Sequence, residues 1–199
     1  RFLQKVPDEG KIIGFVESEP VAKLLAGYKK NSETVGITCD ADWVAKNITV
    51  SGGVWRFEAL KYGKPFGEFT LALPGHHNVC NALCAIALTY HLNVGKELIQ
   101  LALSQFTGVK RRIEYVGSVN GCLIFDDYAH HPAEITASLR ALREKFEGRK
   151  LWCVFQPHQY SRTKLLMKDF AKALQAADII LVTEIYAARD SNSDSKKVS

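Results

Sequence analysis

Three short apolar runs, each leading directly into a polar turn, constrain what the second half of this chain can form. They are residues 122–125, 151–155 and 178–182. Stretches with apolar residues at helical spacing separate them, the first opened by Pro132 and the second centred near Phe170. Almost wholly apolar strands that alternate with helices are typical of a parallel sheet with helices on both faces. The sequence therefore predicts an α/β fold in this half.

The first half follows a different pattern. Alternating apolar and polar residues over 47–73, broken by Gly52-Gly53 and by Gly63, predict two or three antiparallel strands joined by tight turns. The other elements expected along the chain are strands at 11–17, 34–39 and 113–118, and helices at 18–27, from about 78 to 92, and at 95–105. The strand at 113–118 should be a neighbour of residues 122–125.

Each apolar run of the second half ends in a turn dense with polar and aromatic side chains. The turns are Asp126–Pro132, Gln156–Thr163 and Glu184–Arg189. Right-handed crossovers bring the carboxyl ends of parallel strands to one edge of a sheet, where ligands bind in such folds. The first turn could instead be a solvated loop that caps a helix, or its adjacent histidines a metal site, although no third ligand is suitably spaced. We favour one site formed by the three turns together.

Two further polar features lie outside these turns. Asn78 and Asn81 fall on the first turn of a buried helix, and a carboxamide can both donate to and accept from an adenine edge. Capping of the helix by an asparagine is the alternative interpretation. Lys110, Arg111 and Arg112 follow a glycine at the expected domain junction. They suit either phosphate contact or a solvated basic linker, and the sequence alone favours neither.

Composition argues against several classes of function. The net charge is +5 and the basic residues form no long run, so nucleic-acid binding is unsupported. No apolar run is long enough to cross a bilayer, and no membrane association is predicted. Five cysteines, an odd number with no C-x-x-C pair, predict free thiols in a reducing cytoplasm. The chain starts at Arg1 without a methionine and ends in a polar tail, so we expect a piece of a longer protein.

Five segments, in this order, together resemble the Mur ligases. They are Pro74–Leu83, Gly108–Glu114, Asp126–Ile135, Phe155–Thr163 and Ile185–Arg189. Two of them, through Tyr128 and through Phe155–Thr163, favour the member that attaches alanine over the relative that attaches a tripeptide.

The resemblance implies a domain organisation. Residues 1–107 would form the end of a central ATPase domain with antiparallel strands. Residues 108–199 would form an incomplete, Rossmann-like C-terminal domain with a parallel sheet.

The resemblance also assigns roles to single residues on the nucleotide side. Asn78 would recognise adenine with support from Asn81. Asp127 would hold the ATP ribose, and Arg112 would lie near the ATP phosphates. These four are the expected cofactor-binding residues.

On the other side of the reaction, the resemblance places Tyr128, His130, His158 and Arg162 around the incoming amino acid and the acyl intermediate. The expected catalytic residues are Arg112, His130 and Arg162. No residue of this chain is expected to bind a metal, because the family's phosphate-loop lysine and magnesium ligands would lie upstream of Arg1.

The implied reaction is ATP-dependent amide formation in the synthesis of a peptidoglycan precursor. The carboxylate of UDP-N-acetylmuramate attacks the γ-phosphate of ATP, and the amine of L-alanine then displaces phosphate from the acyl phosphate. ATP and Mg²⁺ are the implied cofactors, and the two substrates the implied partners. The enzyme would be a cytoplasmic monomer or homodimer, active only at full length. The alternatives are a related ligase that adds a peptide to UDP-N-acetylmuramate and a non-catalytic nucleotide-binding module, because no G-x-x-x-x-G-K-[S/T] phosphate loop is present.

Overall fold

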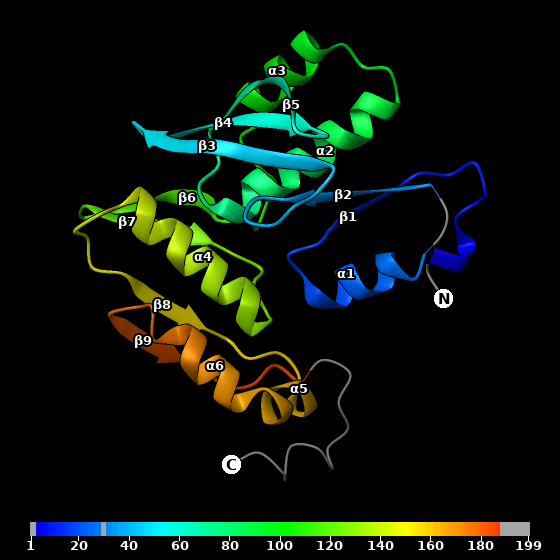
Figure 1. Ribbon diagram of the computed structural model, residues 1–199. Helices are drawn as coiled ribbons and strands as arrows, with labels where there is room; N and C mark the ends of the chain where they lie inside the picture. The colour runs from blue at the N-terminus through cyan, green and yellow to red at the C-terminus, as the bar shows by residue number, and fades with distance from the viewer. Residues whose placement is uncertain (1–2, 29–30, 188–199) are drawn as a thin grey trace. The chain divides into compact units, whose positions relative to one another are not determined.

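The chain forms two compact units, residues 1–107 and 108–199 (Figure 1). The computed structural model describes residues 3–28 and 31–187. Among these residues no helix combines the length and the apolar character needed to span a membrane. Ala188 and Arg189, the last two residues of the Ile185–Arg189 segment, lie outside the described residues.

Unit 1 is built on one mixed sheet with the strand order β1-β2-β3-β4-β5. The strands are β1 (Ile12–Phe15), β2 (Ser32–Gly36), β3 (Trp43–Ser51), β4 (Val54–Lys61) and β5 (Lys64–Leu71). The pairs β1–β2 and β2–β3 are parallel, and β3–β4 and β4–β5 are antiparallel. The predicted antiparallel strands are therefore confirmed, and they begin earlier than expected, at Trp43.

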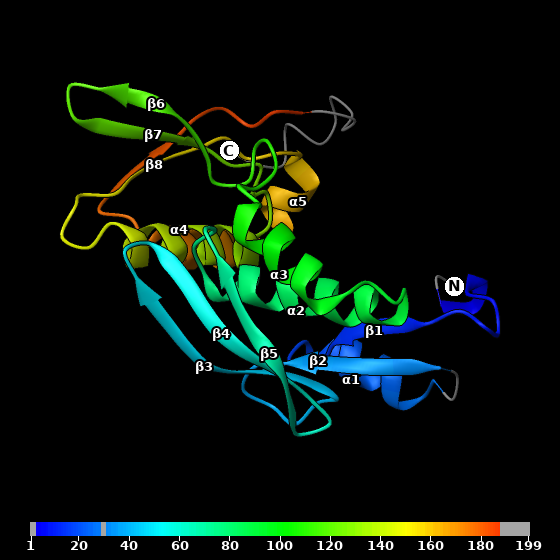
Figure 2. The ribbon, with the colours of Figure 1, turned by 90° about the horizontal axis from the view of Figure 1, so that it is seen from above.

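Helices of unit 1 pack on this sheet (Figure 2). They are α1 (Glu19–Ala26), α2 (His76–His91) and α3 (Lys96–Gln105), so the helices predicted from the sequence are confirmed. A short 3-10 helix, η1 (Leu3–Lys5), was not predicted. α2 contacts four of the strands. Its residues Val79, Leu83 and Ile86 are fully buried because a spacing of three or four residues places them on one face. Trp43 and Phe69 of the sheet complete the centre of this core.

One charged side chain lies inside the core of unit 1. Glu33 on β2 is 3% exposed and accepts hydrogen bonds from Trp43 Nε1 at 2.6 Å and Tyr62 Oη at 3.0 Å. It also pairs with Lys11 Nζ at 3.1 Å and His91 Nε2 at 2.9 Å. Burial alone would raise the pKa of Glu33, but these four donors outweigh it and lower the pKa from 4.5 to about 2.

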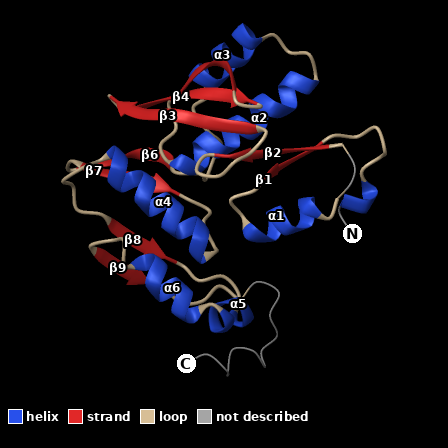
Figure 3. Cartoon of the chain, viewed as in Figure 1, coloured by secondary structure: helices blue, strands red, loops and turns tan. Residues whose placement is uncertain are grey.

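In unit 2, two consecutive strands are followed by helices that lie between the later strands along the chain (Figure 3). The elements are β6 (Glu114–Val119), β7 (Cys122–Asp126), α4 (Pro132–Lys145), β8 (Trp152–Phe155), α5 (Tyr160–Leu165), α6 (Met167–Leu174) and β9 (Ile179–Val182). β6 and β7 form an antiparallel hairpin whose turn, Asn120-Gly121, has positive φ at both residues. α4 packs on α6, and Ile135, Leu139 and Phe170 lie in the small core between these elements and β8.

The fold class is confirmed as mixed α/β, but the sheet of unit 2 differs from the prediction. β8 and β9 pair in parallel, whereas β7 pairs only with β6 among the described residues. A cavity lies between β7 and β8, so their facing edges are not hydrogen-bonded to each other. Helices do not cover both faces either, since Trp152 and Val154 on β8 are 57% and 68% exposed.

Candidate functional site

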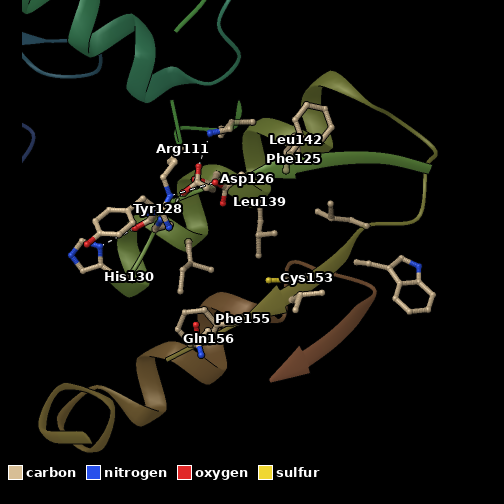
Figure 4. Close-up of a pocket in the computed structure, with 18 of the residues that line it drawn as sticks. Arg111, Phe125, Asp126, Tyr128, His130, Leu139, Leu142, Cys153, Phe155 and Gln156 are labelled. Atoms are coloured by element: carbon tan, nitrogen blue, oxygen red, sulfur yellow. Dashed lines mark hydrogen bonds and ion pairs between the residues drawn. The ribbon is translucent and has the colours of Figure 1, made fainter. Parts of the chain in front are cut away.

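A cavity of about 600 Å³ runs between β7 and β8 and reaches the turns that follow β7, β8 and β9 (Figure 4). Side chains of β7, α4 and β8, including Phe125, Leu139 and Val154, form its apolar walls. The polar residues at its other end are Arg111, Asp126, Asp127, Tyr128, His130, Gln156, His158 and Tyr186. The prediction that the three polar turns come together is therefore confirmed.

Asp127 is held by three hydrogen bonds. Its Oδ2 accepts from the backbone N–H of Ile113 at 2.8 Å and from Ser138 Oγ at 3.1 Å. Its Oδ1 accepts from the backbone N–H of Ala129 at 2.7 Å. A carboxylate has about four lone-pair positions, so Asp127 keeps about one for a ligand. The three hydrogen bonds restrict the direction from which a donor of a ligand could approach.

Tyr128 and His130 lie side by side on the turn after β7, with ring centroids 5.1 Å apart. Nδ1 of His130 is 2.9 Å from the backbone oxygen of Tyr128. A carbonyl oxygen can only accept, so this contact requires a hydrogen on Nδ1. The neutral imidazole then presents Nε2 as an acceptor. The first turn therefore holds an aromatic ring beside a proton acceptor of fixed tautomer.

The second histidine of the turn has a different place. His131 is the N-cap of α4, and its Nδ1 accepts from the backbone N–H of Ala133 at 3.3 Å. Pro132 follows at the first helical position, where a missing N–H costs nothing. The turn therefore combines helix capping with a position at the cavity: His131 caps α4, and His130 lines the cavity.

The turns after β8 and β9 are joined by backbone hydrogen bonds. The N–H of Gln159 donates to the carbonyl of Tyr186 at 2.9 Å, and the N–H of Tyr186 donates to that of Pro157 at 2.8 Å. The rings of His158 and Tyr186 lie 5.5 Å apart. Nδ1 of His158 is buried and has no hydrogen-bond partner among the described residues. His158 is thus placed at the cavity with a polar atom left to pair.

The arginines are arranged differently from expectation. Arg111, which the sequence did not single out from its neighbours, lines the cavity. Its guanidinium lies 4.7 Å from the centre of the Tyr128 ring and 3.4 Å from Asp126 Oδ2. Arg112 and Arg162 are not among the residues that line it. Arg112 lies 3.8 Å from Glu134, and Arg162 is on α5.

Asn78 and Asn81 belong to unit 1, on the first turns of α2. Gly75, with φ of 98°, is the N-cap, so the capping interpretation is wrong for both asparagines. Asn78 Nδ2 donates to the carbonyl of Pro74 at 2.7 Å. No other hydrogen bond of its carboxamide is found in the described part of the chain, so one N–H and the oxygen can meet an adenine edge. Asn81 is exposed.

A metal site is not built by the described residues alone, because no three His, Cys, Asp or Glu side chains among them gather closely enough to hold an ion. The sequence placed Gln156 and Tyr186 in the converging turns and Arg111 in a basic cluster, but it assigned none of the three an individual role at the cavity. It also missed Glu134, although an acidic residue in the first turn of a helix is a recognised signal.

Comparison with known proteins identifies the family. Residues 111–198 match the family described as "Mur ligase, glutamate ligase domain". The chain is 43% identical over 191 residues to the UDP-N-acetylmuramate–L-alanine ligase of Alkaliphilus metalliredigens, covering 96% of this chain and 41% of that protein. Residues 111–198 therefore belong to a Mur ligase domain, and the similarity to named ligases extends over nearly the whole chain. The chain spans about two fifths of the length of the curated relatives it matches.

Solved structures of two ligases have a fold similar to that of this chain. The UDP-N-acetylmuramate–alanine ligase of Thermotoga maritima superimposes with a TM-score of 0.73 at 34% identity, covering 93% of this chain and 40% of that one. A murein peptide ligase of Psychrobacter arcticus gives a TM-score of 0.57 at 26% identity, covering 89% and 44%. The site residues described above therefore lie in a Mur ligase fold.

Proposed function

We propose that this chain is part of an ATP-dependent ligase that joins L-alanine to the carboxylate of UDP-N-acetylmuramate in peptidoglycan precursor synthesis. The observation that carries the proposal is the 43% identity, over 96% of the chain, to a protein named for this reaction. The cavity at the ends of β7, β8 and β9 supports it, because a ligase needs polar groups converging on one place.

In the proposed reaction the muramate carboxylate attacks the γ-phosphorus of ATP, and ADP leaves. The alanine amine then attacks the acyl carbonyl, loses a proton, and inorganic phosphate leaves. Mg²⁺ would neutralise charge on the transferred phosphoryl group. Within this chain, Asn78 and Asp127 would hold adenine and ribose, and Arg112 would meet the phosphates.

Tyr128, His130, His158 and Arg162 would face the alanine and the acyl intermediate. The acceptor Nε2 of His130 is suited to take the proton that the amine loses, because its tautomer is set by the contact of Nδ1 with the Tyr128 carbonyl. The enzyme would work in the cytoplasm as a monomer or homodimer.

The test is phosphate release by the full-length enzyme with ATP, Mg²⁺ and UDP-N-acetylmuramate. We expect release that depends on L-alanine. Release that depends instead on a tripeptide would favour the peptide-adding relative. Nucleotide binding without release under any of these conditions would favour a non-catalytic module.

Asp127 is tested separately. Asp127→Ala is a poor choice, because it leaves the N–H groups of Ile113 and Ala129 without their acceptor. Asp127→Asn keeps an oxygen for one of these two N–H groups, and its melting temperature is measured to detect the loss at the other. It should raise KM for ATP about tenfold or more, since a hydrogen bond to a charged group is lost. The matched control is Asp169→Asn on the exposed face of α6. Wild-type KM in Asp127→Asn would remove this residue from the nucleotide site.

A further inference from the structure

Glu134 contacts both His130, proposed to face the alanine, and Arg112, proposed to meet the ATP phosphates. It is in the first turn of α4. Its Oε2 accepts from the backbone N–H of His130 at 3.0 Å and lies 3.5 Å from His130 Nδ1. Its Oε1 is 3.8 Å from Arg112 Nη1. One carboxylate therefore contacts a candidate substrate-side imidazole and a candidate phosphate-side guanidinium.

The charge on Glu134 is stabilised by these neighbours. Partial burial alone would raise the pKa of its carboxyl group. The hydrogen bond from the His130 N–H, any protonated fraction of the His130 ring and the positive charge of Arg112 outweigh burial and lower the pKa below its ordinary value. Glu134 is therefore ionised at neutral pH, where it attracts the guanidinium of Arg112 and accepts from the backbone N–H of His130.

The contacts also restrict the orientation of both partners. His130 Nδ1 has two acceptors in reach, the Tyr128 carbonyl and Glu134, so its hydrogen stays on Nδ1 and its ring has one preferred direction. Arg112 has a long flexible side chain at the surface, and Glu134 is its one ion-pair partner given by the described residues. Without that partner the guanidinium would lose its fixed position.

We propose that Glu134 is a positioning residue of the ligase, which holds Arg112 and His130 in one arrangement so that phosphoryl transfer and amine attack occur in the same site. The proposal rests on the proposed function. Glu134 is not required to touch a substrate. Its effect should appear in turnover, because misplacing groups that act on the reacting atoms slows chemistry more than binding.

A helix-capping role would give a different result. A carboxylate at this position can stabilise the start of α4 by accepting from backbone N–H groups. Glu134→Gln keeps an oxygen for that purpose and removes the charge that attracts Arg112 and His130. The variant therefore separates positioning from capping.

The experiment compares Glu134→Gln with Glu144→Gln in the full-length enzyme. Glu144 is on the same helix and is exposed. We expect kcat of Glu134→Gln to fall about 10- to 100-fold, with KM for UDP-N-acetylmuramate within about twofold of wild type. The melting temperature should match that of the control. Arg112→Ala combined with Glu134→Gln should lose less than the product of the two single losses, since Glu134 acts through Arg112.

Two results would overturn the inference. The first is wild-type kcat in Glu134→Gln while Arg112→Ala or His130→Asn is impaired, which leaves the proposed function intact. The second is a kcat loss that follows a lowered melting temperature and recovers at a lower assay temperature, as capping would give. Wild-type kcat in all three variants would overturn the proposed site residues as well.

Discussion

The buried carboxylate of Glu33 gives the most quantitative prediction. Glu33→Gln keeps the size of the side chain and removes the charge that pairs with Lys11 and His91. The pKa falls from 4.5 to about 2 on folding, which corresponds to about 3 kcal/mol at neutral pH, since one pKa unit is about 1.4 kcal/mol. Glu33 is only 3% exposed, so screening by solvent reduces this free energy only slightly.

The pH dependence has a definite sign. A group whose folded pKa is lowered stabilises the fold above its ordinary pKa and loses that contribution as the pH falls through the folded value. The destabilisation of unit 1 by Glu33→Gln should therefore be full at pH 7. It should fall to less than half by pH 3, between the ordinary and folded pKa values.

Urea unfolding followed by tryptophan fluorescence measures this in unit 1. Of the three tryptophans, Trp43 and Trp55 are buried in unit 1 and Trp152 is exposed in unit 2. A Trp152→Phe background therefore makes the signal specific. The control is Glu68→Gln, an exposed glutamate on β5 of the same sheet, which should change stability by about 0.5 kcal/mol at most. A loss below about 1 kcal/mol for Glu33→Gln at pH 7, or one equal at pH 7 and pH 3, would refute the reasoning.

Two further predictions concern thiols and the β6–β7 turn. A thiol reagent at pH 8 should modify exposed Cys122 first and Cys80 last, because burial raises the pKa of Cys80 to about 12; mass spectrometry after partial labelling checks this, and equal rates would contradict it. Gly121→Ala should destabilise unit 2 by about 1 kcal/mol, because φ is 78° while an added Cβ would meet no atom within 4 Å. Gly27→Ala, where φ is −85° and an added Cβ would meet no atom closer than 3.8 Å, should show no such loss in thermal unfolding.

Local structure was largely predictable because its causes are local. Pro132 marks the start of α4, and apolar residues such as Ile135 and Leu139, four apart, mark its buried face. The convergence of the turns after β8 and β9 followed from the handedness of the connection between parallel strands, whereas the turn after β7 meets them although β7 is in another sheet. These inferences needed only residue spacing and general geometry.

Pairing between strands was less predictable. The periodicity of β7 and β8 describes each strand, but it does not say which edge meets which partner. The structure separates them by a cavity, so the predicted single sheet of three parallel strands is wrong for β7. Strand order depends on contacts between distant residues, which single-strand patterns do not contain.

The sequence also could not predict which of two adjacent residues of the same type would line the cavity. His130 and His131 differ only in that one precedes the N-cap of α4 and the other is the N-cap. Arg111, with a φ of 59°, lines the cavity, and Arg112 does not. The residue type arginine does not predict a left-handed backbone conformation, so only the three-dimensional structure distinguishes Arg111 from Arg112.

The separation of β7 from β8 has a consequence for how the polypeptide behaves before assembly is complete. On the sides that face the cavity, both strands present N–H and C=O groups that no described strand pairs. Open edges beside apolar walls are templates for any extended segment, including one from another molecule. During synthesis, before these edges find a partner, unit 2 therefore presents backbone groups that can pair with an extended segment of another molecule.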